Sequence, residues 1–384
     1  MKHRLVLFIS LVLCCLLSTS AGAVTANGTT NGWMQVNQSG FGSVDNASIS
    51  ALREINQHLY AGVENQEDGA QIWRMDKNDN WTSIMEGGFG EDYNVAVFDL
   101  VQFKDKIYAG TFGGEIWRSQ NGNNWNRVVT GGFGHSHNKA ILEFLVFKDM
   151  LYCGTGTIMD PYGGEIFRTA TGDAGSWEQI ANYGIDENPD NDGVFSFVEY
   201  NDYMYVSTYN EATGTEVWRT PDGNSGEQSN ADGFGDPLNV SAYLEPFNGF
   251  LYAGTTYFKD GSGAGAELWR CTHCNNPGNW KKVPIQKGFG DPNNRSIVPL
   301  SGPDGMLYAL VDNRVSGMQV WVSKDGVNFS QISQGGFGDS GNIYPFHNAN
   351  RFYRNFLYTG TGNLTTGGQV WKRAFLTQLP LIPK

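Results

Sequence analysis

The sequence predicts an all-β fold, a seven-bladed β-propeller with four antiparallel strands in each blade. Three observations support this prediction: a pattern of about 50 residues recurs seven times, each copy reads as four short strands, and the two ends of the chain complement each other. Glycine and aromatic residues are both abundant, with 50 Gly, 23 Phe, 17 Tyr and 11 Trp among 384 residues. Such a composition suits many short strands joined by tight turns.

Three short phrases mark each repeat. The first is GGFG or a variant, the second is a Tyr followed by small residues, as in LYAG, and the third holds an aromatic anchor, as in EIWR. Only the fourth repeat departs from the first phrase, reading NYGI at residues 182–185. Successive tyrosines lie 44 to 56 residues apart, which is the period of a propeller blade. The seven tyrosines are Tyr60, Tyr108, Tyr152, Tyr205, Tyr252, Tyr308 and Tyr358.

The second repeat illustrates the four strands of one unit. We expect them over residues 94–104, 105–112, 115–119 and 125–130, separated by turns rich in Gly, Asp and Asn. The chain starts with a fourth-strand phrase at residues 33–36 and ends with a third-strand phrase at residues 369–371. The N-terminal strand should therefore pair with the last blade and close the ring, which removes the open sheet edges.

The N-terminus has the features of a secretory signal peptide over residues 1–23. Lys2 and Arg4 precede an apolar run that is too short to span a membrane, and Ala23 ends a small-residue cleavage site. We therefore expect a secreted or cell-surface protein without a membrane span. The expected organisation is a flexible N-terminus over residues 24–32, the propeller over 33–375 and a C-terminal tail over 376–384.

The charge balance argues against some classes of binding partner. The chain carries 39 acidic and 26 basic residues, a formal net charge of −13. A surface of this sign repels phosphate groups, which argues against nucleic acid and anionic membranes as partners. The sequence does not indicate an oligomeric state.

An Asn follows the GGFG phrase in each repeat. One interpretation is a ring of oxygens around the channel mouth that binds a sugar or a cation; the alternative is that each Asn satisfies backbone groups where the loop enters the strand. Repetition in every blade favours the structural alternative. We expect no cofactor unless these oxygens bind Ca²⁺. The positions are Asn46, Asn94, Asn138, Asn188, Asn239, Asn294 and Asn342.

A second polar ring begins each third strand. Because a basic residue follows three positions later in most repeats, we expect ion pairs between neighbouring blades or solvated charges on the outer rim. The positions are Gln71, Glu115, Glu165, Glu216, Glu267, Gln319 and Gln369.

The hairpins after three of the third strands look like shortened Asp-boxes. They are SQNGNNW at residues 119–125, SKDGVNF at 323–329 and a partial copy, TPDG, at 220–223. On these hairpins the chain resembles the BNR or Asp-box superfamily of β-propellers. It also resembles, less closely, propeller lectins of the tachylectin or tectonin type, which repeat GG-aromatic and LYA phrases. The Asp-box resemblance implies the fold and not an activity, since such hairpins lie away from the active site of sialidases.

Three features break the sevenfold repetition. His135 and His137 replace the acidic loop of the third repeat and are candidate metal ligands, although a solvated loop is the alternative. Cys271 and Cys274 form a C-x-x-C pair, for which a disulfide is expected in an exported protein; zinc would need two further ligands. The divergent fourth repeat gathers four acids: Asp186, Glu187, Asp190 and Asp192.

These features favour a non-catalytic binding protein that recognises glycans or proteins on the loop-rich face of the propeller. The alternative is a secreted hydrolase, similar to a glycosidase, with an acidic site at the channel mouth and the four acids of the fourth repeat as its best catalytic candidates. A purely structural surface protein is the third interpretation. The question of enzymatic activity stays open, with the balance against it.

Overall fold

The computed structural model describes residues 29–157, 162–181, 185–258, 264–344 and 346–375. The expected signal peptide and C-terminal tail lie outside these ranges. The described chain is all-β and its strands pair antiparallel. Within the described ranges, no helix has the length and apolar character needed to cross a membrane.

Most strands fall into successive four-strand antiparallel units. In chain order, the strands of the first half are β1 (Thr29–Thr30), β2 (Trp33–Gln35), β3 (Asn46–Ile55), β4 (His58–Asn65), β5 (Gln71–Met75), β6 (Trp81–Met85), β7 (Val97–Phe103), β8 (Lys106–Thr111), β9 (Ile116–Ser119), β10 (Trp125–Val129), β11 (Asn138–Phe147), β12 (Met150–Thr157), β13 (Ile166–Thr169) and β14 (Glu178–Ala181).

The strands of the second half are β15 (Gly193–Tyr200), β16 (Tyr203–Tyr209), β17 (Val217–Thr220), β18 (Glu227–Gln228), β19 (Asn239–Phe247), β20 (Phe250–Tyr257), β21 (Leu268–Cys271), β22 (Lys281–Lys282), β23 (Asn294–Ser301), β24 (Leu307–Asn313), β25 (Gln319–Ser323), β26 (Ser330–Gln331), β27 (Asn350–Tyr353), β28 (Phe356–Gly360) and β29 (Val370–Ala374). Short 3-10 helices connect them: η1 (Ser39–Gly42), η2 (Gly87–Gly90), η3 (Gly131–Gly134), η4 (Asp232–Gly235), η5 (Pro277–Asn279), η6 (Lys287–Gly290) and η7 (Gly335–Gly338).

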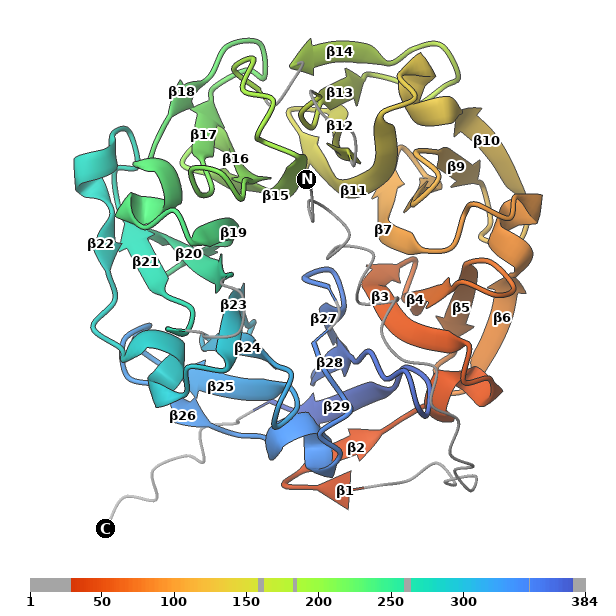
Figure 1. Cartoon of the computed structure of the whole chain (residues 1–384). Helices are drawn as coiled ribbons and strands as arrows, with labels where there is room; N and C mark the ends of the chain where they lie inside the picture. The colour runs from red at the N-terminus through yellow and green to blue at the C-terminus, as the bar shows by residue number, and fades with distance from the viewer. Residues whose placement is uncertain (1–28, 158–161, 182–184, 259–263, 345, 376–384) are drawn as a thin grey trace.

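The sheets stand around a common centre as the blades of a β-propeller (Figure 1). The first strand of each unit lies nearest the centre, and the fourth lies at the rim (Figure 1). In the second repeat the four predicted strands are present as β7 to β10. The first of them begins at Val97 and not at residue 94; the backbone N–H of Asn94 donates to the carbonyl of Glu91 in the loop.

The two ends of the described chain share one sheet, in the order β1-β2-β29-β28-β27. Met34 of β2 lies opposite Lys372 of β29, and Gln35 lies opposite Trp371. The expected pairing of the N-terminal strand with the last third strand is therefore present. Strand β1 differs from the expectation of a flexible terminus, since residues 29 and 30 form a hairpin with β2.

Hydrophobic cores form between neighbouring blades and bury both faces of each sheet. One core combines Ile55, Tyr60 and Ile72 of the first unit with Leu100 and Ile107 of the second. A sheet that is covered on both faces needs apolar residues at consecutive positions, which explains why the strands do not alternate strictly between apolar and polar residues.

The GGFG phrases fold into the 3-10 turns that lead from one unit into the next. In η2, Phe89 adopts a left-handed backbone conformation (φ 63°), which is unusual for a bulky residue and turns its ring into the blade. The ring stacks on Trp117 with centroids 4.7 Å apart and meets the edge of Trp125 at 5.6 Å. The same stack on a third-strand aromatic occurs at Phe41, Phe133, Phe234, Phe289 and Phe337.

The repeated tyrosines reach from one unit to the hairpin of the next. A side chain at Gly326 would place its Cβ 2.0 Å from the hydroxyl oxygen of Tyr252 in the preceding unit. The hairpin itself is held by Asp325, whose Oδ1 accepts the backbone N–H groups of Val327 and Asn328. These hydrogen bonds hold the pKa of Asp325 well below its usual range. The Asp of this hairpin therefore bonds local backbone, as expected.

Candidate functional site

The two predicted polar rings form a single structural network inside each blade. In the second unit, Nδ2 of Asn94 donates to the carbonyl of Gly88 at 3.1 Å and to Oε2 of Glu115 at 2.8 Å. The indole N–H of Trp117 donates to the same carboxylate oxygen at 2.9 Å. Asn94 and Glu115 are fully buried, so these groups fix the GGFG loop against the third strand and do not face a ligand.

The Asn residues of the other units have the same role, but in the fourth unit the residue differs from the predicted one. Asn46, Asn138, Asn239, Asn294 and Asn342 are buried and donate to the equivalent loop carbonyl. In the fourth unit the equivalent residue is Asn191, which is buried and donates to Glu216 at 2.8 Å. Asn188, the residue chosen from the sequence, lies three positions earlier in the loop and is half-buried. Extra residues in the loop of the fourth unit place the equivalent Asn at position 191 and not at position 188.

The predicted ion pairs between the Glu ring and the basic residues of the third strands are wrong. Arg118 pairs with Asp173 of the next hairpin at 2.6 Å, while Arg168 and Arg219 pair with acids of their own blades. Two of the ring carboxylates have basic partners in the loop or the fourth strand instead: Arg127 lies 2.8 Å from Glu115, and Lys287 lies 2.8 Å from Glu267. The spacing of Glu and Trp by two residues was the missed signal, because it places both side chains on one face of the strand.

The four acids of the fourth repeat are spread along the loop. Asp186 and Glu187 are exposed, Asp190 is half-buried, and Asp192 is buried just before β15. The backbone N–H of Asp192 donates to the carbonyl of Tyr209 at 2.8 Å. The four acids thus lie in different environments along the loop.

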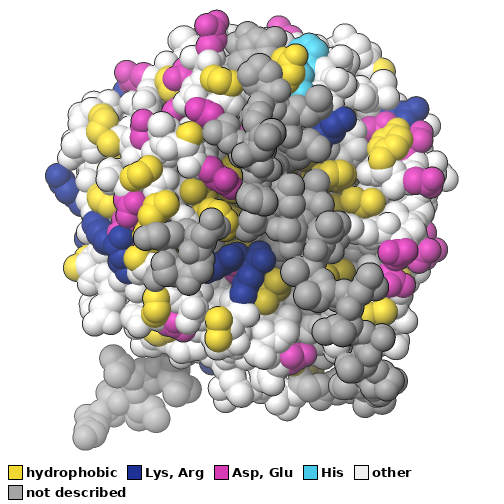
Figure 2. Space-filling view, viewed as in Figure 1, with side chains coloured by type: hydrophobic (Ala, Val, Ile, Leu, Met, Phe, Trp, Pro, Cys, Tyr) yellow, Lys and Arg dark blue, Asp and Glu magenta, His cyan; other side chains and the backbone are white. Residues whose placement is uncertain are grey.

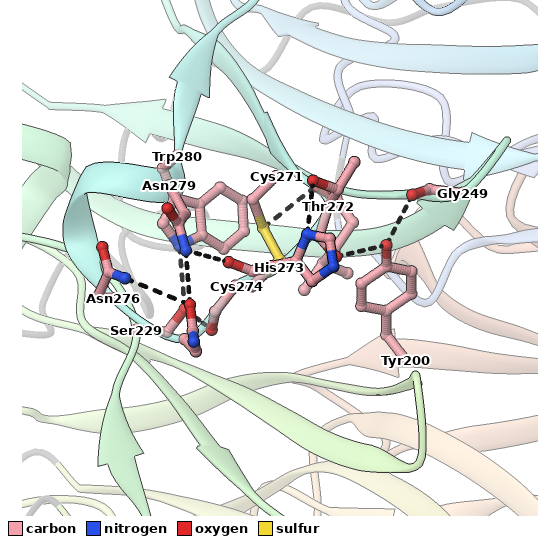
Figure 3. Close-up of a disulfide and its surroundings, with 12 residues drawn as sticks. Tyr200, Ser229, Gly249, Cys271, Thr272, His273, Cys274, Asn276, Asn279 and Trp280 are labelled. Atoms are coloured by element: carbon pink, nitrogen blue, oxygen red, sulfur yellow. Dashed lines mark hydrogen bonds between the residues drawn. A yellow bond between two sulfur atoms is a disulfide. The ribbon is translucent and has the colours of Figure 1, made fainter.

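The structure joins Cys271 and Cys274 by a disulfide in the hairpin of the fifth unit (Figure 3). The preceding unit holds this hairpin from two sides. The hydroxyl of Tyr200 donates to the carbonyls of Gly249 and Thr272, and the hydroxyl of Ser229 donates to the carbonyl of Cys274 at 2.8 Å (Figure 3). The disulfide therefore replaces the Asp-type hairpin as the rigid contact between two blades.

His135 and His137 meet at the carboxylate of Glu165. Nδ1 of His135 lies 2.8 Å from Oε2, and Nε2 of His137 lies 3.4 Å from Oε1. The two candidate ligands predicted from the sequence are therefore brought together, and the structure adds an acidic residue that the sequence had placed in the repeated ring.

An aromatic pocket lies where the inner strands of the fourth to sixth units meet the segment before β27. We call it the aromatic pocket. Its rings come from both tyrosines and phenylalanines, and three charged residues are also part of the lining. The residues are Phe195, Tyr209, Tyr243, Phe258, Tyr344 and Phe346 with Arg295, Asp312 and Arg314.

The charged residues of the aromatic pocket share one carboxylate. Arg295 donates to Oδ2 of Asp312 at 2.9 Å, and Nε of Arg314 lies 3.5 Å from the same oxygen. Oδ1 of Asp312 is buried and accepts no hydrogen bond from the described residues. Burial lowers the pKa of Arg314, and burial raises the pKa of Tyr243 to about 12. The pocket thus combines apolar ring faces with a largely buried group of two guanidiniums and one carboxylate.

A central cavity of about 450 Å³ adjoins this pocket, and Tyr243 lines both. Its wall carries Glu143, Glu245 and His347. Burial raises the pKa of Glu245 to about 7. Nε2 of His347 lies 3.1 Å from Glu143, whose Oε2 also accepts the backbone N–H of Phe197 at 3.0 Å. The inner carboxylates therefore bind the first strand of the next blade.

Figure 2 shows the face of the propeller that is turned toward the viewer in Figure 1. Acidic side chains are scattered around the rim of this face, and a group of Lys and Arg side chains lies near its centre. The sequence did not reveal the aromatic pocket, because its residues occupy positions at which the repeats differ. The search for repeated phrases averages over those positions. The signal that could have found it is the departure of single repeats from the shared pattern, as at Arg295 and Arg314.

No family model matches the chain, and no curated protein sequence matches it. Among solved structures, it is similar to a GH74 xyloglucanase from Xanthomonas campestris, with a TM-score of 0.59, 15% identity and coverage of 91% of this chain and 54% of that one. It is also similar to a chain of the mitotic checkpoint complex, with a TM-score of 0.57, 11% identity and coverage of 94% and 100%. The chain spans about half the length of the xyloglucanase. At these identities the similarity supports the β-propeller fold alone.

Proposed function

We propose that the protein is an exported, non-catalytic binding protein whose aromatic pocket recognises a glycan. The observation behind this proposal is the combination of aromatic rings with the charged groups of Arg295, Asp312 and Arg314 in one pocket. A sugar presents an apolar face of C–H groups and a rim of hydroxyls. Aromatic rings can stack on the apolar face, and a few fixed polar groups can form hydrogen bonds with the hydroxyls, as in small-molecule sites generally.

The scaffold for this site is a closed ring of seven Asp-box-type blades. Contacts between the first and last units support closure: the backbone N–H of Leu52 donates to the carbonyl of Asn348 at 2.7 Å, and that of Ile49 donates to Thr361 at 3.1 Å. One hydrophobic core also joins Leu52 to Tyr358 and Val370. A ring without open edges holds pocket residues from several blades at fixed distances, which lowers the entropic cost of binding.

A glycan array tests the proposal. The protein is applied with and without EDTA, beside the variants Asp312→Asn and Arg314→Ala. We expect selective binding that EDTA does not abolish and that either pocket variant weakens at least tenfold. The double variant Asp186→Asn/Glu187→Gln is the control, because both acids are exposed outside the pocket. Absence of binding by the wild type, or equal binding by the pocket variants, would contradict the proposal.

N-terminal sequencing of exported protein, expected to begin at Val24, tests secretion.

A secreted hydrolase is the second candidate, favoured by the buried carboxylates around the central cavity. Burial raises the pKa of Glu245 in the cavity wall to about 7, the range of a general acid, and raises that of Asp99, which pairs with Arg53 of the wall, to about 6. Against this candidate, both side chains accept backbone N–H groups of the next blade, Phe144 and Ser301. Release of reducing sugar from oligosaccharides found on the array, abolished by Glu245→Gln, would favour hydrolysis over binding.

A further inference from the structure

The third unit departs from the others at three positions that lie together. Its third strand carries Phe167 where the other units have Trp, and its loop carries His135 and His137. In the other units, the indole N–H donates to the ring Glu or Gln; in the second unit, Trp117 donates to Glu115. Phe167 has no such donor. The carboxylate of Glu165 therefore meets two imidazole rings in place of an indole.

The three side chains converge on one small volume. One ligand atom from each of His135, His137 and Glu165 lies within 4.8 Å of the others. The imidazole rings stand 5.4 Å apart with planes inclined by 21°. Among the described residues, this is the one group of three or more His, Cys, Asp or Glu side chains with metal-ligand proximity.

Surrounding groups hold two of the three ligands in place. Nδ2 of Asn138 donates to Oε2 of Glu165 at 2.6 Å, which orients the carboxylate. Tyr162 stacks on His137 with centroids 4.2 Å apart and planes 5° apart. Side-chain exposure is 1% for Glu165 and 10% for His137, but 40% for His135. The site thus has two fixed ligands and one that can turn toward a metal from the solvent side.

We propose that His135, His137 and Glu165 bind a divalent transition metal, zinc above all, at the loop of the third blade. Two imidazoles and a carboxylate form a common zinc ligand set, with solvent or a ligand oxygen at the open position. Tetrahedral bonds of about 2.0–2.1 Å place ligand atoms about 3.3 Å apart. The separation of 3.4 Å between His137 and Glu165 matches this value, and a rotation of His135 supplies the third ligand. Asn138 is the outer partner that orients the carboxylate.

The competing explanation is an ion pair between a protonated histidine and Glu165. The second unit has such a pair, with Arg127 at 2.8 Å from Glu115. An ion pair needs one imidazole, whereas the metal site needs both. The two explanations therefore differ in whether the wild type binds zinc and whether removal of the two histidines abolishes that binding.

Zinc titration of the chain, produced without a polyhistidine tag and stripped with chelator, tests the proposal. Isothermal titration calorimetry should show one Zn²⁺ per chain for the wild type. His135→Ala/His137→Ala should lose this equivalent, and Phe167→Trp, which restores the indole donor of the other units, should weaken it at least tenfold. His347→Ala, outside the site, should bind as the wild type does. The Co²⁺ spectrum of the unsubstituted protein, with the intense absorption of a tetrahedral N/O site, provides a measurement independent of variant folding.

Failure of the wild type to bind zinc, or undiminished binding by the double histidine variant, would overturn the proposal. The test is independent of glycan recognition, because the aromatic pocket contains none of these residues. Loss of zinc with glycan binding intact would support the metal site and leave the function proposed above unaffected.

Discussion

Asp99 on β7 accepts a hydrogen bond from the backbone N–H of Phe144 on β11, in the next blade, at 2.9 Å. Equivalent contacts run from Glu143 to Phe197, from Ser196 to Leu244 and from Glu245 to Ser301. The first strands near the propeller centre are thus joined by side chain to backbone hydrogen bonds. These bonds satisfy N–H groups that the sheet of the same blade leaves free.

Asp99→Ala should destabilise the protein by about 2–4 kcal/mol, because it leaves buried donors without a partner. Those donors include the backbone N–H of Phe144 and the guanidinium of Arg53, which lies 2.9 Å from the carboxylate. Urea denaturation measures the change. Asp92→Ala, at an exposed loop position, is the matched control and should change stability by less than about 0.5 kcal/mol. Equal effects of the two substitutions would contradict a role of Asp99 in joining the blades.

Stability should fall as pH rises from about 5 to 8, and Glu64 should contribute to this fall. Burial raises the pKa of Glu64 from 4.5 to about 7, so the folded protein holds a proton that the unfolded chain releases in this range. The contribution is present below pH 4.5 and is lost as pH rises through 7. Glu64→Gln cannot ionise and should exceed the wild type by up to about 3 kcal/mol at pH 8, yet match it near pH 4.5. Thermal unfolding at both pH values measures this difference. A stability difference between variant and wild type that is the same at both pH values would contradict the role given to Glu64.

Gly326→Ala should be far more damaging than Gly249→Ala. Both glycines have a left-handed backbone, with φ of 73° and 75°, so the conformational penalty is similar. They differ in their surroundings: a Cβ at Gly326 meets the Tyr252 hydroxyl at 2.0 Å, and a Cβ at Gly249 has nothing within 4 Å. We expect a cost of about 1 kcal/mol at Gly249 and at least twice that at Gly326. Melting temperatures compare the two, and the addition of Tyr252→Phe should recover part of the loss at Gly326.

Deletion of residues 24–36 should lower the melting temperature sharply, whereas deletion of residues 24–28 should leave it nearly unchanged. The longer deletion removes Trp33, which is fully buried, packs 5.1 Å from the ring of Phe337 and donates its indole N–H to Ile332 at 3.0 Å. Loss of a buried Trp costs about 3–5 kcal/mol. Trp33→Ala separates this contribution from that of the strand pairing. Equal melting temperatures of the two deletion variants would show that β2 contributes nothing to the stability of the last sheet.

The sequence was sufficient for the strands and for the pairing of β2 with β29, because both follow from repeated phrases and local turn chemistry. It was not sufficient for the partners of Glu115, since several groups converge on that carboxylate, among them Tyr93, Trp117 and Arg127, and only their three-dimensional positions show this. Asn188 was chosen over Asn191 because a loop insertion obscures the alignment. Both amides donate to Glu216, at 2.9 and 2.8 Å, and the burial of Asn191 identifies it as the equivalent residue. The aromatic pocket was missed altogether, since no repeated phrase includes Arg295 or Arg314.

The pairing of β2 with β29 has a consequence for the order of synthesis. Residues 33–35 are synthesised long before residues 370–374, and until then β2 has only β1 as its backbone partner. Such a contact has nearly the greatest sequence separation available, which makes it a late folding step. While the chain is being made, one edge of β2 therefore stays unpaired, and this edge should become protected from proteases when β29 pairs with it.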